Sequence, residues 1–306
     1  MPNVLFRLRK ALIFFITNFI PFTETRRSIR DRVMLKQFHS KKYAFENNTK
    51  FKNYLNAVAI IKNEAPYLRE WIEYHRILGI EKFYIYDDAS TDKPFDVLAK
   101  YIDAGIVIYE KVYRNPKKNL TDVQRKIYTK AVRRYKNKTR WLAIFDIDEF
   151  FVPLKHNSIV EFLKEYEEFS QIIIHWKMFG SSGHTAKPAG LVIENYNYSH
   201  EDVHLTGKSI VNPRAILRQA EVHYSKVIGM PVDERKHLYP QDPSVIGATA
   251  DIMCINHYWS KSEEEFVSRR GYLASDVLKK FDAQAVKFDD SIKRFIPAVK
   301  KALANN

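Results

Sequence analysis

The chain has 306 residues, of which 45% are hydrophobic and 28% are charged, and its formal net charge is +14. This balance is typical of a globular protein and excludes a wholly disordered or collagen-like chain. A single cysteine, Cys254, excludes an intrachain disulfide framework and fits a reducing compartment.

The chain begins with a basic arm and linker, residues 1–53, which contain 12 Lys/Arg and 3 Asp/Glu. Its apolar run, residues 11–22, lies between arginine clusters and is shorter than the roughly 20 residues of a membrane-spanning helix. Residues 23–26 lack the small side chains of a signal-peptide cleavage site. We therefore predict a monotopic helix on an anionic membrane surface; the alternative is a helix packed on the protein's own core. The Phe, Ile and Leu content argues against nucleic-acid binding.

Strands and helices alternate in the next part of the chain. Short apolar runs predict strands at 57–61, 82–86, 106–109 and 141–145, and helical patterns lie between them at 66–78, 96–101 and 121–136. Pro66 favours a helix start, Gly79 a helix end, and Thr121 a cap for the last helix. This alternation predicts an α/β fold, a Rossmann-like and mostly parallel sheet flanked by helices.

Acidic and amide side chains follow three of the four predicted strands. They are Asn63 and Glu64, then Asp87 and Asp88, then Asp146, Asp148 and Glu149. Ligands of such sheets bind beyond the carboxyl ends of the strands. Carboxylates two residues apart share one face of extended chain, so Asp146 and Asp148 suit Mg²⁺ or Mn²⁺. Asx turns and helix caps are the alternative for the first two groups.

The end of the chain is basic again, since residues 278–306 contain 7 Lys/Arg and 3 Asp/Glu. Residues 54–277 are close to neutral overall, although residues 111–140 contain 12 basic residues and one acid, Asp122. We therefore predict one globular domain at 54–277 between two basic segments, the second being a helical tail.

Ordered blocks between residues 57 and 272 resemble those of family-2-like or family-92-like glycosyltransferases. The blocks are Ile61–Glu64, Leu68–Gly79, Phe83–Asp92, Phe145–Phe150, His175–His184, Lys208–Pro213 and Asn256–Phe266. The resemblance implies a GT-A fold and a nucleotide-sugar donor. Such a number of ordered blocks is far more specific than an isolated Asp-x-Asp.

The resemblance also implies roles for single residues. Asp146 and Asp148 would hold Mn²⁺ or Mg²⁺ and the donor diphosphate, and His257 would complete the metal site, with His223 as its competitor. Donor contacts are implied at Asn63, Glu64, Asp87, Asp88 and Asp146, at Lys261, and at the adjacent Arg269 and Arg270.

A catalytic base is needed if the sugar is transferred with inversion, because the acceptor hydroxyl must lose its proton. Glu201 and Asp202 resemble the paired acids at this stage of related enzymes, and Asp233 with Glu234 is the alternative.

These observations predict a metal-dependent glycosyltransferase that moves a hexose from a UDP-sugar to a hydroxyl of a growing surface glycan or glycolipid. The basic arm, the single cysteine and the lack of a spanning anchor predict a bacterial enzyme, peripheral on the cytoplasmic face of the membrane. An inactive scaffold of a glycan-assembly complex is one alternative. A sugar-1-phosphate nucleotidyltransferase would need a Gly-rich loop after the first strand, and a nucleic-acid binder would leave the acidic strand ends unexplained.

Overall fold

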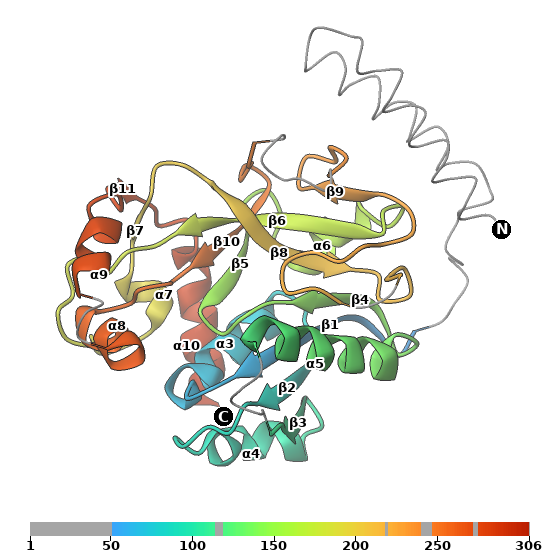
Figure 1. Cartoon of the computed structure of the whole chain (residues 1–306), viewed down its shortest axis with the longest axis horizontal. Helices are drawn as coiled ribbons and strands as arrows, with labels where there is room; N and C mark the ends of the chain where they lie inside the picture. The colour runs from blue at the N-terminus through green and yellow to red at the C-terminus, as the bar shows by residue number, and fades with distance from the viewer. Residues whose placement is uncertain (1–50, 114–118, 218–219, 240–246, 272–274, 306) are drawn as a thin grey trace, which may run out of the picture.

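The computed structural model describes residues 51–113, 119–217, 220–239, 247–271 and 275–305 (Figure 1). The predicted arm lies almost wholly in residues 1–50, outside this part of the chain. In the described residues no helix is long and apolar enough to cross a bilayer. The predicted alternation is confirmed by β1 (Asn53–Ile61), α3 (Ala65–Ile77), β2 (Lys82–Asp87), α4 (Pro94–Asp103), β3 (Val107–Lys111), α5 (Leu120–Tyr135) and β4 (Thr139–Ile144).

The second half of the chain adds shorter elements to the same sheet. They are β5 (Glu149–Pro153), α6 (Ile159–Lys164), β6 (Gln171–Met178), α7 (Val192–Asn195), β7 (Tyr198–Ser199), β8 (His204–Val211), β9 (Pro231–Asp233), β10 (Met253–His257), α8 (Glu263–Arg270), α9 (Ser275–Asp282), β11 (Lys287–Phe288) and α10 (Ile296–Ala304). β7 and β11 form a separate two-stranded sheet.

The large sheet has the order β3-β2-β1-β4-β8-β6-β10-β5, with β9 paired to β6. The first four strands are parallel, as are β10 and β9 to β6. β8 runs antiparallel to both β4 and β6, and β5 runs antiparallel to β10. The predicted α/β class with a mostly parallel sheet is therefore confirmed, with antiparallel insertions that join its two halves.

Helices cover both faces of the sheet. Successive side chains of a strand point to opposite faces, so alternate residues of β1 pack against different helices. Val58 of β1 packs with the buried side of α5, whereas its neighbours Ala57 and Ala59 belong to the core formed with α3. Figure 1 shows α5 lying across β1 and β4. The helix ends follow local chemistry: Gly79, at φ 101°, ends α3. The predicted cap of α5 at Thr121 is wrong, since the Asn119 side chain accepts the Thr121 backbone N–H at 2.8 Å.

Residues near the C-terminus pack against α3. The Phe295 ring meets Tyr74 edge-on at 5.6 Å, Val299 of α10 is fully buried, and Arg69 donates to the Leu303 carbonyl oxygen at 3.0 Å. The lysines of this segment, such as Lys301, lie outside on exposed positions. Part of the predicted basic tail thus contributes to the core of the globular domain.

His75 joins α3 to β5 in the centre of this core. Its Nδ1 lies 2.8 Å from the Trp71 carbonyl oxygen, so Nδ1 carries the proton, and its Nε2 accepts the Phe151 backbone N–H at 3.3 Å. The second bond needs the neutral imidazole, because a protonated Nε2 could not accept it. Burial accordingly lowers the pKa of His75 from 6.5 to about 3.

We expect acid to destabilise the protein through His75. Between pH 6.5 and about 3 the unfolded chain binds a proton that the folded chain does not, so the free energy of unfolding falls as pH falls. The loss from this group is up to about 1.4 kcal/mol per pH unit. Urea unfolding across this range measures it. His75→Gln should be less stable at pH 7 and should lack this share of the pH dependence; an unchanged slope would contradict the assignment.

Candidate active site

The Asp146–Glu149 turn joins β4 to β5 and is held from several sides. The Trp71 indole N–H donates to the carbonyl oxygens of Asp146 and Glu149, both at 3.1 Å. The Asp146 backbone N–H donates to Glu149 Oε2 at 3.0 Å, and Tyr258 donates its backbone N–H to the Asp148 carbonyl oxygen at 2.8 Å. The backbone of the predicted metal motif is therefore fixed by α3 and by the chain that follows β10.

Asp148, Glu149 and His257 converge at this turn, with one ligand atom of each lying within 4.8 Å of the others. The β5–β10 register places His257 opposite Glu149. Asp148 Oδ2 lies 3.6 Å from His257 Nε2, which is longer than a hydrogen bond. The Asp148 carboxylate raises the pKa of His257 against the effect of burial, and His257 holds the pKa of Asp148 well below its usual range.

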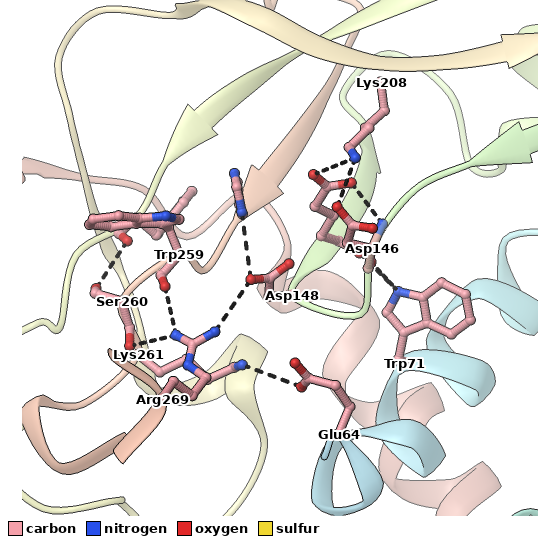
Figure 2. Close-up of polar contacts among 12 residues, drawn as sticks. Glu64, Trp71, Asp146, Asp148, Lys208, Trp259, Ser260, Lys261 and Arg269 are labelled. Carbon is pink, nitrogen blue, oxygen red and sulfur yellow. Dashed lines mark hydrogen bonds and ion pairs between the residues drawn. The ribbon is translucent and has the colours of Figure 1, made fainter. Parts of the chain in front are cut away.

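Lys208 of β8 supplies a buried positive charge on one side of the turn (Figure 2). Its Nζ lies 2.7 Å from Asp146 Oδ2 and 3.8 Å from Glu149 Oε1. Burial raises the pKa of Glu149 to about 7, a shift that Lys208 opposes, and the two carboxylates raise the pKa of Lys208 despite its burial. The predicted site residues omit Lys208, although it begins one of the blocks that carry the family resemblance.

Lys261 and Arg269 supply positive charge on the opposite side of Asp148 (Figure 2). Arg269 Nη1 lies 3.6 Å from Asp148 Oδ2, and its Nη2 donates to the Trp259 and Ser260 carbonyl oxygens at 2.7 and 3.1 Å. Lys261 has a left-handed backbone, at φ 54°, and its buried Nζ has no hydrogen-bond partner among the described residues.

The Lys261 ammonium lies 4.0 Å from Glu64 Oε2 and 4.0 Å from the centre of the Tyr67 ring. Burial raises the pKa of Glu64 to about 7, which the Lys261 charge opposes, and burial lowers the pKa of Lys261. Glu64 Oε2 also lacks a hydrogen-bond partner in the described part of the chain. A buried ammonium and carboxylate without hydrogen bonds are costly unless a ligand completes them.

The donor set at the turn fits a divalent cation. Glu149 Oε1 and His257 Nδ1 are buried and have no hydrogen-bond partner among the described residues. Carboxylate oxygens suit Mg²⁺ and Mn²⁺, whereas an imidazole nitrogen suits transition metals. The combination of Asp148 and His257 therefore fits Mn²⁺ better than Mg²⁺, with Asp146 adjacent.

Asn63, Asp87 and Asp88 lie at the carboxyl ends of β1 and β2, whose register pairs Ile61 with Asp87. Asn63 Oδ1 accepts the Thr91 N–H at 2.8 Å, and Asp87 accepts the Ser90 N–H at 2.8 Å and the Tyr109 hydroxyl. Asp88 is buried and donates its backbone N–H to Ile61. These bonds tie two neighbouring loops together beside Glu64, so the turn role and a donor role are compatible.

Glu201 and Asp202 are exposed in the loop between β7 and β8. His204, which begins β8 directly after this loop, has its ring centre 5.6 Å from that of Trp176, and the Trp176 ring centre lies 4.6 Å from that of His257. The assignment of the base to this pair stays a prediction.

The alternative base and the alternative ligand have other partners. Asp233 accepts the Arg235 and His237 backbone N–H groups, and Glu234 accepts the backbone N–H groups of residues 251–253. β9, which ends at Asp233, pairs with the start of β6, away from the site. His223 Nδ1 lies 3.1 Å from the Gly207 carbonyl oxygen, and burial lowers its pKa. Burial and the nearby Lys208 charge favour the neutral imidazole of His223, and His257 is the histidine that lies with the carboxylates Asp148 and Glu149.

Comparison with known proteins finds relatives of this chain among plant proteins. A protein of Arabidopsis thaliana described as glycosyltransferase family 92 protein is 27% identical over 58% of this chain and 32% of its own length. A Ricinus communis protein of the same description is 26% identical over 69% of this chain and 37% of its own. An Arabidopsis galactan beta-1,4-galactosyltransferase is 32% identical over 34% of this chain and 22% of its own. The chain thus spans about a third of the length of these curated plant relatives.

Among solved structures, S. aureus TarS with UDP aligns at a TM-score of 0.34 and 13% identity over 53% of this chain and 47% of its own. A Pyrobaculum calidifontis mannosyltransferase with GDP-Man and Mn²⁺ aligns at 0.30 and 12% over 54% and 47%. Scores this low carry no functional information. The family model described as glycosyltransferase family 92, by contrast, matches residues 52–285, the sheet and the carboxylate site together. The chain belongs to glycosyltransferase family 92.

Proposed function

We propose that the protein is a metal-dependent glycosyltransferase that moves a hexose from a UDP-sugar to a hydroxyl of a surface glycan or glycolipid, with inversion. The observation that carries the proposal is the convergence of Asp148, Glu149 and His257 between two sets of cations. Carboxylates that could hold a metal ion, beside a lysine ammonium without hydrogen-bond partners, would together bind a ligand with clustered negative charge. A nucleoside diphosphate has that chemistry.

The residues around the turn would hold the metal ion and the diphosphate of the nucleotide-sugar. Asp148 and His257 would hold the metal, with Asp146 and Glu149 beside them, and the bound metal would neutralise charge on the departing diphosphate. The Lys261 ammonium has no hydrogen-bond partner among the described residues and could donate hydrogen bonds to phosphate oxygens. Arg269 contacts Asp148 directly, and its guanidinium suits phosphate oxygens.

The loops at the ends of β1 and β2 would receive the nucleoside. Asn63 follows β1 and Asp87 ends the adjacent parallel strand β2, and Glu64, next to Asn63, pairs with Lys261. The galactan galactosyltransferases among the relatives make UDP-galactose the first donor to test. A bacterial origin and a peripheral place on the cytoplasmic membrane face remain part of the proposal and depend on the basic arm.

Donor turnover tests the proposal. The purified full chain is incubated with UDP-, GDP- and CMP-sugars and Mn²⁺, and the free nucleotide is measured with and without EDTA. We expect slow, EDTA-sensitive hydrolysis of one UDP-sugar. No turnover and no nucleotide binding across the panel would favour the inactive scaffold, whereas binding without turnover would direct the search to glycolipid acceptors.

The exposed acid pair gives a separate prediction about the base. Asp202→Asn or Glu201→Gln should lower kcat for transfer about 10²–10⁴-fold while donor affinity stays unchanged, because a base acts on the acceptor and not on the donor. Transfer assays and donor titrations measure the two quantities. Glu221→Gln, which also alters an exterior acid, is the control. Two fully active variants would place the base elsewhere.

A further inference from the structure

The outer side of α5 and the turn after it carry a row of exposed cations, which we name the α5 basic stripe. Its members are Lys126, Lys130, Arg133, Arg134, Lys136 and Lys138. Glu110 pairs with Lys130 and Arg134. Among the described residues, no ion pair joins Lys126, Arg133 or Lys136 to an acid. The stripe therefore retains most of its positive charge.

The stripe is not needed to hold α5 on the sheet. The inner side of the helix packs through Ile127, Tyr128, Ala131, Val132 and Tyr135, which are all buried. Cations three or four residues apart on a helix repel each other by about 0.2–0.5 kcal/mol per pair. A helix that keeps this arrangement without an internal use for it suits a partner with a dense negative surface.

The point where the N-terminal arm enters the domain identifies that partner. The Asn53 backbone N–H donates to the Lys138 carbonyl oxygen at 3.0 Å, and the Phe51 ring lies 4.0 Å from the Arg214 guanidinium. The sequence before Phe51 contains the apolar run of residues 11–22 between arginine clusters. A partner that binds both the apolar run and the α5 basic stripe needs an apolar interior under an anionic surface.

The carboxylate site lies behind the other end of the stripe, on the inner side of α5. Tyr128, which is buried about half a turn from the exposed Lys126, has its hydroxyl 3.5 Å from Asp146 Oδ1. Lys126 to Lys136 spans roughly 15 Å at the rise of an α-helix. We propose that the α5 basic stripe docks on an anionic lipid bilayer, with the arm entering the domain at one end of the stripe and the carboxylate site behind α5 at the other.

Vesicle binding by the full chain tests the proposal. Phosphatidylcholine vesicles with and without phosphatidylglycerol are the probes. The test variant is K126E/R133E/K136E, and the matched control is K280E/K287E/K301E, which makes the same charge change at exposed positions elsewhere. Each basic residue near an anionic surface contributes about 1 kcal/mol, so we expect the test variant to lose affinity about a hundredfold or more. The control should bind phosphatidylglycerol vesicles nearly as the unchanged chain does.

Other outcomes would overturn the docking surface. Equal losses in both variants would show that total charge matters and position does not, and a test variant that binds normally would leave the arm as the sole contact. Normal vesicle binding with lost binding to duplex DNA would show a nucleic-acid surface. If the reversal variant fails to fold, K126Q/R133Q/K136Q replaces it, with a smaller expected loss. Because soluble donor hydrolysis is not required for vesicle binding, failure here is distinct from failure of the proposed activity.

Discussion

Replacing Asp148 with asparagine should abolish the EDTA-sensitive hydrolysis of the donor, lowering kcat about a thousandfold or more. The side chain keeps its shape and loses the charge that lies 3.6 Å from both His257 Nε2 and Arg269 Nη1. Metal neutralisation of a leaving diphosphate contributes several kcal/mol to the transition state, which corresponds to this factor. Asp276→Asn, at an exposed position on α9, is the control and should be fully active.

The same substitution has a readout that does not depend on turnover. A metal that binds only the folded chain raises its thermal midpoint by mass action. Mn²⁺ should therefore raise the midpoint of the unchanged protein and of Asp276→Asn but not of Asp148→Asn. If Asp148→Asn retained both the Mn²⁺ shift and EDTA-sensitive turnover, the metal would lie elsewhere in the molecule.

Replacing Lys208 with methionine should lower the free energy of unfolding by about 3–5 kcal/mol, the usual result of removing one partner of a buried ion pair. Lys208 is the cation between Asp146 and the fully buried Glu149. Without it, both carboxylates lose their nearest positive charge. Equilibrium unfolding in urea, at the pH where the unchanged protein is most stable, measures the loss.

A double-mutant cycle separates the electrostatic cause from lost packing. Glu149→Gln removes the buried charge, so Lys208→Met in that background should cost clearly less than it does alone. Lys280→Met, on the exposed side of α9, should change stability by less than about 0.5 kcal/mol. Additive losses at residues 149 and 208 would show that Lys208 acts only through its volume.

The first half of the fold could be predicted because local patterns determine it. The apolar runs at β1, β2 and β4 form strands that are almost entirely buried, and Gly79 ends α3 through a left-handed conformation that glycine adopts without strain. Parallel crossovers then bring the strand ends together, so the neighbours Asn63 and Asp87 could be expected at one edge. Asp148 could be proposed as a site residue in the same way, because it follows a buried strand.

The rest depends on pairings between remote segments, which no local pattern encodes. Lys208 reaches Asp146 only because β8 inserts antiparallel between β4 and β6. His257 meets Glu149 only because β10 pairs with β5. The cap of α5 differs for a local reason, since both Asn119 and Thr121 are good capping residues and the chain uses the earlier one.

The hydrogen bonds from the Trp71 indole to the Asp146–Glu149 turn have a thermodynamic consequence. Trp71 bonds to the carbonyl oxygens of Asp146 and Glu149, the two ends of the turn that carries Asp148. Ordering the backbone of that turn costs about 1–2 kcal/mol of conformational entropy per residue, and this cost therefore arises when the chain folds and not when a ligand binds. The carboxylates are preorganised, and the ligand's affinity reflects the contacts it makes there.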